Sequence, residues 1–203
     1  NWGRLERAGF WLRCQDFNDC GLLEAHEAAD WADLLANRFN VLFTNVLWWR
    51  SLQCMASMAE DLGKNNSAYT AKAEEVRKIM NMLFFLPEDG SERTRNRQEL
   101  GKLNGEWYAV YAQMDAQWWY RPYYLPYVEW RNPGEDRLDT LGNMLCVAFG
   151  LADPARSAGI LDYVRDYGVN RPYPAKACYP VILPGNPDWR TYYLCREYCK
   201  PHS

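Results

Sequence analysis

The strongest hydrophobic pattern in the chain lies between residues 41 and 62. Apolar side chains recur there at alternating spacings of four and three, which places them on one side of an α-helix. The series is Val41, Asn45, Trp48, Leu52, Met55, Ala59 and Leu62. Neighbouring apolar residues widen this stripe beyond half of the circumference, which is typical of a buried helix. The pattern predicts a long buried helix that ends before Gly63.

A more polar helix follows over residues 68–85, with Asn66 or Ser67 as its N-cap. The same order returns later in the chain. Residues 138–150 are apolar, and residues 155–167 form a second partner helix that Asp153 and Pro154 begin. A buried helix, a turn and a partner helix therefore occur twice, and they predict an all-α fold of helical hairpins.

The remaining segments are assigned from local signals. They are a helix over 2–14 that buries Trp2, Leu5, Phe10 and Leu12, a mobile charged loop over 87–97, a helix or short strands over 103–114, an ordered extended loop over 118–130, and a last helix over 188–199. Pro122 and Pro126 disfavour helix in the extended loop.

Composition narrows the classes of function. The chain has 203 residues, which suits one domain, with 48% hydrophobic and 24% charged residues. A net charge of −3 without a basic block argues against a nucleic-acid partner. No apolar run reaches the roughly 18 residues of a membrane span, so we expect no membrane partner.

Aromatic residues are abundant. The chain has ten Trp and fourteen Tyr, many of them between residues 107 and 130. Aromatic rings stack on the C–H faces of sugars, and they serve equally well in cores and interfaces. The sequence leaves both uses open.

Cysteine and histidine give little sign of a cofactor. Short bridges are conceivable between Cys14 and Cys20 and between Cys195 and Cys199, but we favour reduced cysteines in an intracellular protein. The two histidines have no metal-ligand spacing, so we expect no metal and no other cofactor.

Two carboxylates flank a tryptophan in the segment Asp30-Trp31-Ala32-Asp33, just before the long buried helix. One of them would serve as a general acid if apolar surroundings raised its pKa. The alternative is the capping of a helix N-terminus, a common role of aspartate.

A second acidic group follows the aromatic loop. It comprises Glu129, Glu135, Asp136 and Asp139, with Arg131 and Arg137 between them, and ion pairing at the surface is the favoured interpretation. Asn45 and Asn143 lie on apolar helix faces, where each is either a ligand contact or a hydrogen-bonded core amide.

The acidic segment and the helix that begins Asn45-Val-Leu-Trp48-Trp49 resemble the acid-bearing loop and inner helix of six-hairpin (α/α)6-barrel glycoside hydrolases. The similarity is to the amylo-α-1,6-glucosidases of glycogen debranching and to the neutral/alkaline invertases. Residues 139–143, 150–154, 178–180 and 188–190 resemble the invertase-type run, and the likeness extends in order over residues 21–203.

The resemblance implies an (α/α)6 toroid that is incomplete in this chain, with residues 1–203 as part of a single catalytic domain. It implies hydrolysis of an O-glycosidic bond with inversion, with Asp33 as the general acid and Asp30 as the second choice. The family's base glutamate follows a segment beyond Ser203. The relatives often carry an acidic residue at the position of Phe43.

The expected partner is a carbohydrate substrate, with self-association or the remainder of a larger chain as further possibilities. For stacking we expect Trp31, Trp118, Trp119 and Tyr124, and for polar contacts Asn45, Glu129, Arg131 and Asp139. The alternatives are a non-catalytic helical-hairpin module that binds carbohydrate or protein, and a toroid lyase or epimerase. The latter would need a Tyr/His or His/His pair in its cleft.

Overall fold

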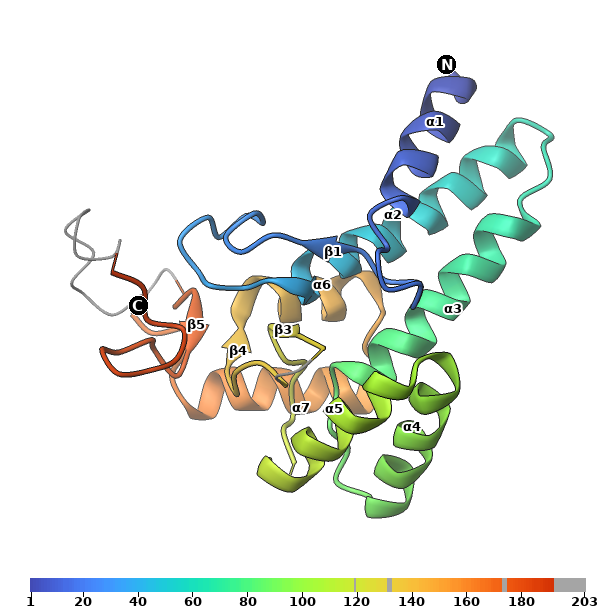
Figure 1. Ribbon diagram of the computed structural model, residues 1–203. Helices are drawn as coiled ribbons and strands as arrows, with labels where there is room; N and C mark the ends of the chain where they lie inside the picture. The colour runs from blue at the N-terminus through green and yellow to red at the C-terminus, as the bar shows by residue number, and fades with distance from the viewer. Residues whose placement is uncertain (119, 131–132, 173–174, 192–203) are drawn as a thin grey trace.

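A computed structural model describes residues 1–118, 120–130, 133–172 and 175–191. These residues are mostly helical, which confirms the predicted class at this coarse level (Figure 1). The helices are α1 (Trp2–Arg13), α2 (Leu42–Asp61), α3 (Ser67–Leu83), α4 (Gly90–Leu103), α5 (Gly105–Gln117), α6 (Thr140–Phe149) and α7 (Pro154–Asp166). The strands are short: β1 (Glu24–Ala25), β2 (Phe39–Val41), β3 (Tyr127–Val128), β4 (Leu138–Asp139) and β5 (Cys178–Tyr179).

Both predicted hairpins are present. Helix α3 returns alongside α2, and α7 follows α6 after a turn at Gly150, whose φ of 78° is in the left-handed region. Helices α2 and α6 also pack against each other. Asp153 caps α7, because its side chain accepts a hydrogen bond from the Arg156 N–H over 2.8 Å. The two apolar helices thus face each other, each with a more polar partner.

The prediction of a mobile loop over residues 87–97 was wrong, because α4 begins there. Asp89 caps this helix by accepting a hydrogen bond from the Ser91 N–H over 2.8 Å. Its buried face consists of Arg93, Asn96 and Leu100, and Arg93 pairs with Asp115 of α5 over 2.9 Å. Charged residues on the buried side concealed the helical period.

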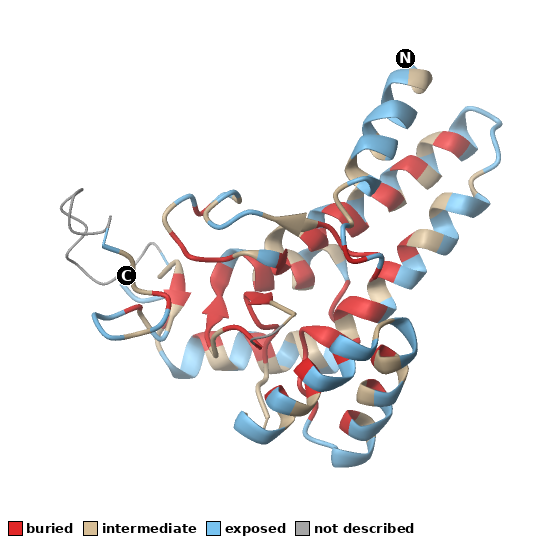
Figure 2. Ribbon diagram, viewed as in Figure 1, coloured by how far each residue is buried: buried red, intermediate tan, exposed pale blue. Residues whose placement is uncertain are grey.

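The first helix lies where it was predicted, but it contains no buried residue. Phe10 is 61% exposed and Leu5 41% exposed, so the expected burial was wrong for these two residues, while Trp2 and Leu12 are half-buried. Helix α1 extends along the end of the α2–α3 hairpin and touches it on one side only, where the Trp2 and Tyr69 rings lie 5.9 Å apart (Figure 2). An amphipathic pattern did not reveal that the helix is covered on one side alone.

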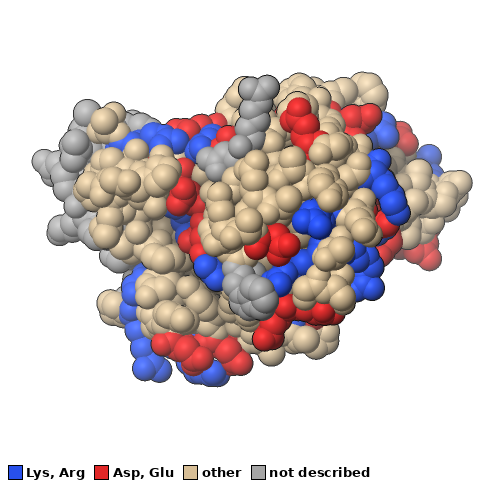
Figure 3. All heavy atoms as spheres, turned by 60° about the horizontal axis from the view of Figure 1, so that its bottom comes forward, with Lys and Arg blue, Asp and Glu red and all other residues tan. Residues whose placement is uncertain are grey.

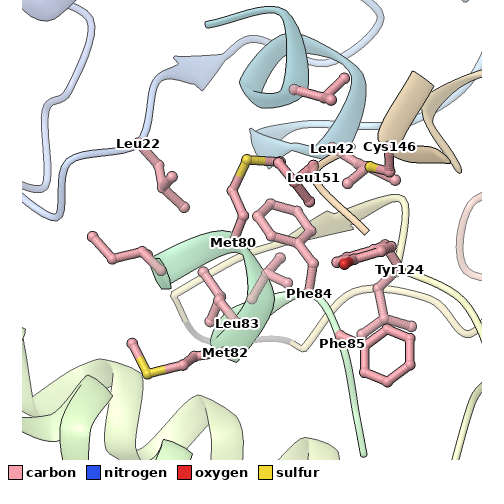
Figure 4. Packing of buried hydrophobic residues seen from close by; sticks show 14 of the residues in the cluster. Leu22, Leu42, Met80, Met82, Leu83, Phe84, Phe85, Tyr124, Cys146 and Leu151 are labelled. Carbon is pink, nitrogen blue, oxygen red and sulfur yellow. The ribbon is translucent and has the colours of Figure 1, made fainter. Parts of the chain in front are cut away.

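The core joins the hairpins to the aromatic loop. Phe84 and Phe85, at the end of α3, pack with Tyr124 of the loop and with Leu42 and Cys146 of α2 and α6 (Figure 4). The described residues of the predicted loop, 118 and 120–130, form no helix beyond the end of α5, in agreement with the predicted extended loop, and residues 123–128 are buried.

The short strands gather at the N-terminal ends of α2 and α6 (Figure 1). Strand β2 pairs with β1 and β3 and runs directly into α2, while β4 pairs with β5 and runs into α6. The backbone is irregular at residues 188–190, so the predicted last helix does not begin there, and residues 192–199 lie outside the described part. No helix in the described ranges is long and apolar enough to cross a membrane.

Candidate functional site

Two buried asparagines fix loops against the first turns of α2 and α6. In α2, Asn45 accepts a hydrogen bond from the Leu23 N–H over 2.8 Å and donates to the carbonyls of Leu23 and Val41, each over 3.0 Å. These contacts satisfy the amide completely within the protein. Asn45 is therefore a hydrogen-bonded core amide, the second of the two roles open to it.

Asn143 repeats this arrangement in α6. It accepts from the Tyr124 N–H over 2.8 Å and donates to the carbonyls of Tyr124 and Asp139, each over 2.9 Å. Each asparagine thus binds both backbone groups of one loop residue and the carbonyl four residues before itself. The two hairpins begin in the same way, and residues 41 and 139 are equivalent positions.

Asp30 organises the acidic loop between β1 and β2. Its carboxylate accepts hydrogen bonds from the Ala32 N–H over 2.8 Å and from the Asn37 side chain over 3.4 Å. The inner side of the loop is held by a small apolar cluster of Ala32, Leu35, Cys178 and Ile182. The loop is therefore held both by the hydrogen bonds of Asp30 and by this apolar cluster.

Trp31 and Asp33 lie on either side of buried Ala32 and are themselves exposed. Trp31 is 40% exposed, and its ring lies 6.2 Å from that of Phe43 in the first turn of α2. Asp33 belongs to a loop and does not cap a helix. The capping alternative is thus excluded for Asp33, and its carboxylate is accessible to a ligand.

Two neighbouring carboxyls have raised pKa values. Burial raises the pKa of Asp30, partly offset by its hydrogen bonds, and the negative charge of Asp33 raises it further. Burial raises the pKa of Asp139 to about 7, and the charge of Asp30 adds to this. Asp30 therefore lies near Asp139 as well as near Asp33, which brings the acidic loop to the start of α6.

Asp139 is 1% exposed. Within the described part of the chain neither of its carboxyl oxygens accepts a hydrogen bond of good geometry, although the N–H groups of Leu141 and Gly142 lie near. The equivalent residue at the start of α2 is Val41, so the fold does not require a carboxyl there. Since it is buried, Asp139 offers a bound sugar no hydroxyl contact in this conformation.

Four charged residues and one tyrosine border the acidic loop. We call them the Arg38 cluster: Arg38, Tyr127, Glu129, Arg137 and Asp188. Arg38 pairs with Glu129 over 2.5 Å and with Asp188 over 3.2 Å, and its guanidinium lies 5.1 Å from the centre of the Tyr127 ring. Burial raises the pKa of Glu129, and the charge of Arg38 opposes this shift. The carboxylate of Glu129 is thus engaged by the protein itself.

The inner residues of the Arg38 cluster, Arg137 and Asp188, are buried. Asp188 is 1% exposed and pairs with Arg137, which is 4% exposed. The predicted pairing of Arg137 at the surface was therefore wrong, because its side chain lies in the interior, where it pairs with buried Asp188. A further pair, Arg190 with Glu27 over 2.6 Å, ties the last described residues to the acidic loop.

The residues predicted to stack on a sugar lie in different environments. Tyr124 is fully buried, and its hydroxyl donates to Asn81 over 2.6 Å, so it serves the core and offers no face to a sugar. Trp118 is half-buried and packs against the core. Trp119 and Arg131 lie outside the described residues.

Sequence reasoning missed Arg38, Tyr127 and Asp188. Their pairing joins positions far apart in the chain, and no local sequence signal connects them. The described ranges contain no group of three His, Cys, Asp or Glu side chains that could hold a metal ion. In the same ranges the thiols of Cys14, Cys20, Cys54, Cys146 and Cys178 are free. No model of a known protein family matches this chain, and no curated protein does.

Proposed function

We propose that this chain is part of a glycoside hydrolase that cleaves an O-glycosidic bond with inversion. The observation that carries the proposal is the pair of exposed side chains, Trp31 and Asp33, on a loop that Asp30 holds rigid at the start of α2. An exposed ring beside an exposed carboxyl suits a sugar, whose apolar face stacks while its glycosidic oxygen meets the acid.

The repeated hairpins support the finer proposal of an (α/α) toroid. Such a fold repeats an inner helix and an outer helix, with its binding loops at one end of the inner helices. Here α2 and α6 pack together, begin with the same asparagine arrangement, and carry the acidic loop and the Arg38 cluster at that end. Matched local structure in both hairpins agrees with a repeat architecture.

In the proposed mechanism Asp33 donates a proton to the leaving oxygen. A second carboxylate activates water on the opposite face of the sugar, about 6.5–9.5 Å from the acid. The resemblance places that base in a glutamate beyond residue 203. Asp30 keeps the acidic loop in position by accepting a hydrogen bond from the Ala32 N–H.

The test uses the native polypeptide that contains these 203 residues, with the variant Asp33→Asn. Hydrolysis is followed by release of reducing sugar from an α-1,6-branched glucan, an α-1,4-glucan and sucrose. We expect the rate to fall about 100-fold or more, because a general acid contributes on the order of 10²–10⁴. Asp61→Asn is the matched control, since Asp61 is exposed at the opposite end of α2.

The circular dichroism spectra and the midpoint temperatures of thermal unfolding should be the same for both variants and the parent protein. Equal turnover by Asp33→Asn and the parent would rule out Asp33 as the acid. A parent protein that hydrolyses none of the three substrates would contradict the proposed function for those linkages.

A further inference from the structure

A surface hollow of about 590 Å³ lies beside α7. This volume is in the range of small-molecule binding sites. Its walls come from the loop over residues 120–123, from Asp136 before β4, and from α7 with the turn that follows it. The acidic loop between β1 and β2 lies on the other side of α6 and β4 (Figure 1), so the hollow is separate from the Asp33 site.

A stack of tyrosine rings forms one wall. The ring centres of Tyr123 and Tyr163 are 4.8 Å apart, and those of Tyr163 and Tyr167 are 4.4 Å apart with an angle of 31° between planes. Tyr179 supports Tyr167 over 5.6 Å. Tyr167 is nevertheless 54% exposed. Its ring is thus held in place by its neighbours and still open to a ligand, which lowers the entropic cost of binding.

Polar groups of both kinds surround these rings. Arg121 and Asp136 pair over 2.7 Å, and the Tyr123 hydroxyl donates to Asp136 over 2.8 Å. Burial raises the pKa of Tyr163 to about 12, so its hydroxyl stays protonated and can donate. Guanidinium and phenol donors therefore lie beside carboxylate acceptors, an arrangement that matches the hydroxyl groups of a sugar.

The charged side chains that line the hollow are paired within the protein, which argues against a cationic ligand, the rival for an aromatic site. Asp162 and Asp166 line the hollow, but both pair with Arg165, over 2.9 and 3.1 Å. Arg121 and Asp136 also line the hollow, and their ion pair neutralises both charges. On the face drawn in Figure 3, the described acidic and basic side chains are likewise interleaved. A neutral, hydroxyl-rich ligand suits this balance better than a cation.

We propose that the hollow binds a sugar unit of a neutral glycan, with the ring stacked on Tyr167 and the hydroxyls bound by Arg121, Asp162 and Asp166. This site would bind one sugar unit of a polysaccharide at a distance from the bond that is cleaved at the Asp33 site. It goes beyond the proposed hydrolase function and does not require it, because binding here needs neither Asp33 nor turnover.

The experiment measures retardation of the native polypeptide that contains these 203 residues in native gels with glycogen, xyloglucan or a mixed-linkage β-glucan, and each variant is also measured with Asp33→Asn to exclude hydrolysis. We expect at least one polysaccharide to retard the chain and Tyr167→Ala to weaken that binding about tenfold, which corresponds to about 1.4 kcal/mol. Tyr167→Phe should keep most of the affinity, because it keeps the ring. Leu161→Ala is the control, since Leu161 is 47% exposed on α7, the helix that Tyr167 follows.

A second variant, Asp166→Asn, leaves the ring stack intact and should weaken binding if the hydroxyl contacts are as proposed. The proposal is overturned if no polysaccharide retards the chain, if Tyr167→Ala binds as tightly as the parent, or if Leu161→Ala loses affinity equally. It is also overturned if tetramethylammonium, tested by titration against the Tyr167 ring signals in NMR, saturates the hollow. Loss of hydrolysis in Asp33→Asn with unchanged retardation would keep the two sites distinct.

Discussion

The hydroxyl of Tyr127 donates a hydrogen bond to the carboxylate of Asp188 over 2.8 Å, and both residues are buried. The two lie 61 positions apart in the sequence. Their contact joins β3, which adjoins the start of α2, to the segment after β5, which adjoins the start of α6. The Arg38 cluster thus acts as a cross-link between the loops at the ends of the two inner helices.

Removal of the Asp188 carboxylate should destabilise the chain strongly. In Asp188→Ala the buried guanidinium of Arg137 loses its nearer carboxylate and keeps only Glu135, 3.9 Å away, and breaking a buried pair costs about 3–5 kcal/mol. Tyr127→Phe removes one hydrogen bond and should cost about 0.5–1.5 kcal/mol. Urea unfolding of both variants provides the comparison. Equal losses would mean that the Arg137 pair contributes nothing beyond the hydrogen bond.

Both asparagine arrangements should contribute to stability. In Asn45→Leu the N–H of Leu23 loses its partner, while its C=O keeps the hydrogen bond from Asn40 over 3.2 Å. In Asn143→Leu both the N–H and the C=O of Tyr124 lose theirs. A buried polar group left without a partner costs about 1–3 kcal/mol, so each variant should lose about 2–4 kcal/mol in urea unfolding. Gln113→Leu on the exposed side of α5 is the control. A neutral result for either asparagine would contradict the equivalence of the two hairpins.

Two glycines should respond in opposite directions to alanine. A Cβ on Gly142 in α6 would collide with the carboxyl of Asp139 and lie 3.0 Å from Leu42 of α2. We expect Gly142→Ala to lower stability by about 1–3 kcal/mol despite its higher helix propensity. Gly9 in α1 has no neighbour within 4 Å of such a Cβ, so Gly9→Ala should stabilise by up to about 1 kcal/mol. Thermal unfolding distinguishes the two, and a gain for Gly142→Ala would mean that α6 can move away from α2.

The sequence predicted the helices that bury an apolar stripe and missed the one that buries charge. Helix α2 was predicted from its series of apolar residues, because spacings of four and three along a long segment indicate an amphipathic α-helix. Helix α4 buries Arg93 and Asn96, which a hydrophobic pattern counts as exposed. Only the partner Asp115 on α5 makes Arg93 an interior residue, and a single sequence does not record that pairing.

The same limit applies to the candidate site. The acidic loop was identified because Asp30, Trp31 and Asp33 are adjacent in the chain. The Arg38 cluster was not, since its members come from residues 38, 127–137 and 188, which only the fold brings together. Tyr124 illustrates the converse, because an aromatic residue in an aromatic loop has the same appearance in sequence whether it faces a ligand or the core.

Asp139 should make the stability of the chain depend on pH. Its pKa is about 7 in the folded chain against an ordinary value of 3.8, so between these values the folded state keeps a proton that the unfolded state has lost. Stability should therefore fall as the pH rises from about 4 through 7, and above this range the loss is on the order of 4 kcal/mol. Asp16, Glu24, Asp30, Glu129 and Glu135 also have raised pKa values and act in the same direction.

The contribution of Asp139 is isolated by comparing the parent with Asp139→Asn and Asp139→Val in urea unfolding from pH 4 to pH 8. Valine reproduces the residue at the equivalent position of α2, so both variants should gain stability relative to the parent as the pH rises. Asp30→Asn removes a nearby negative charge and should shift the fall in stability to lower pH. A constant difference between the parent and Asp139→Val across this range would show that the carboxyl of Asp139 does not keep its proton in the folded chain.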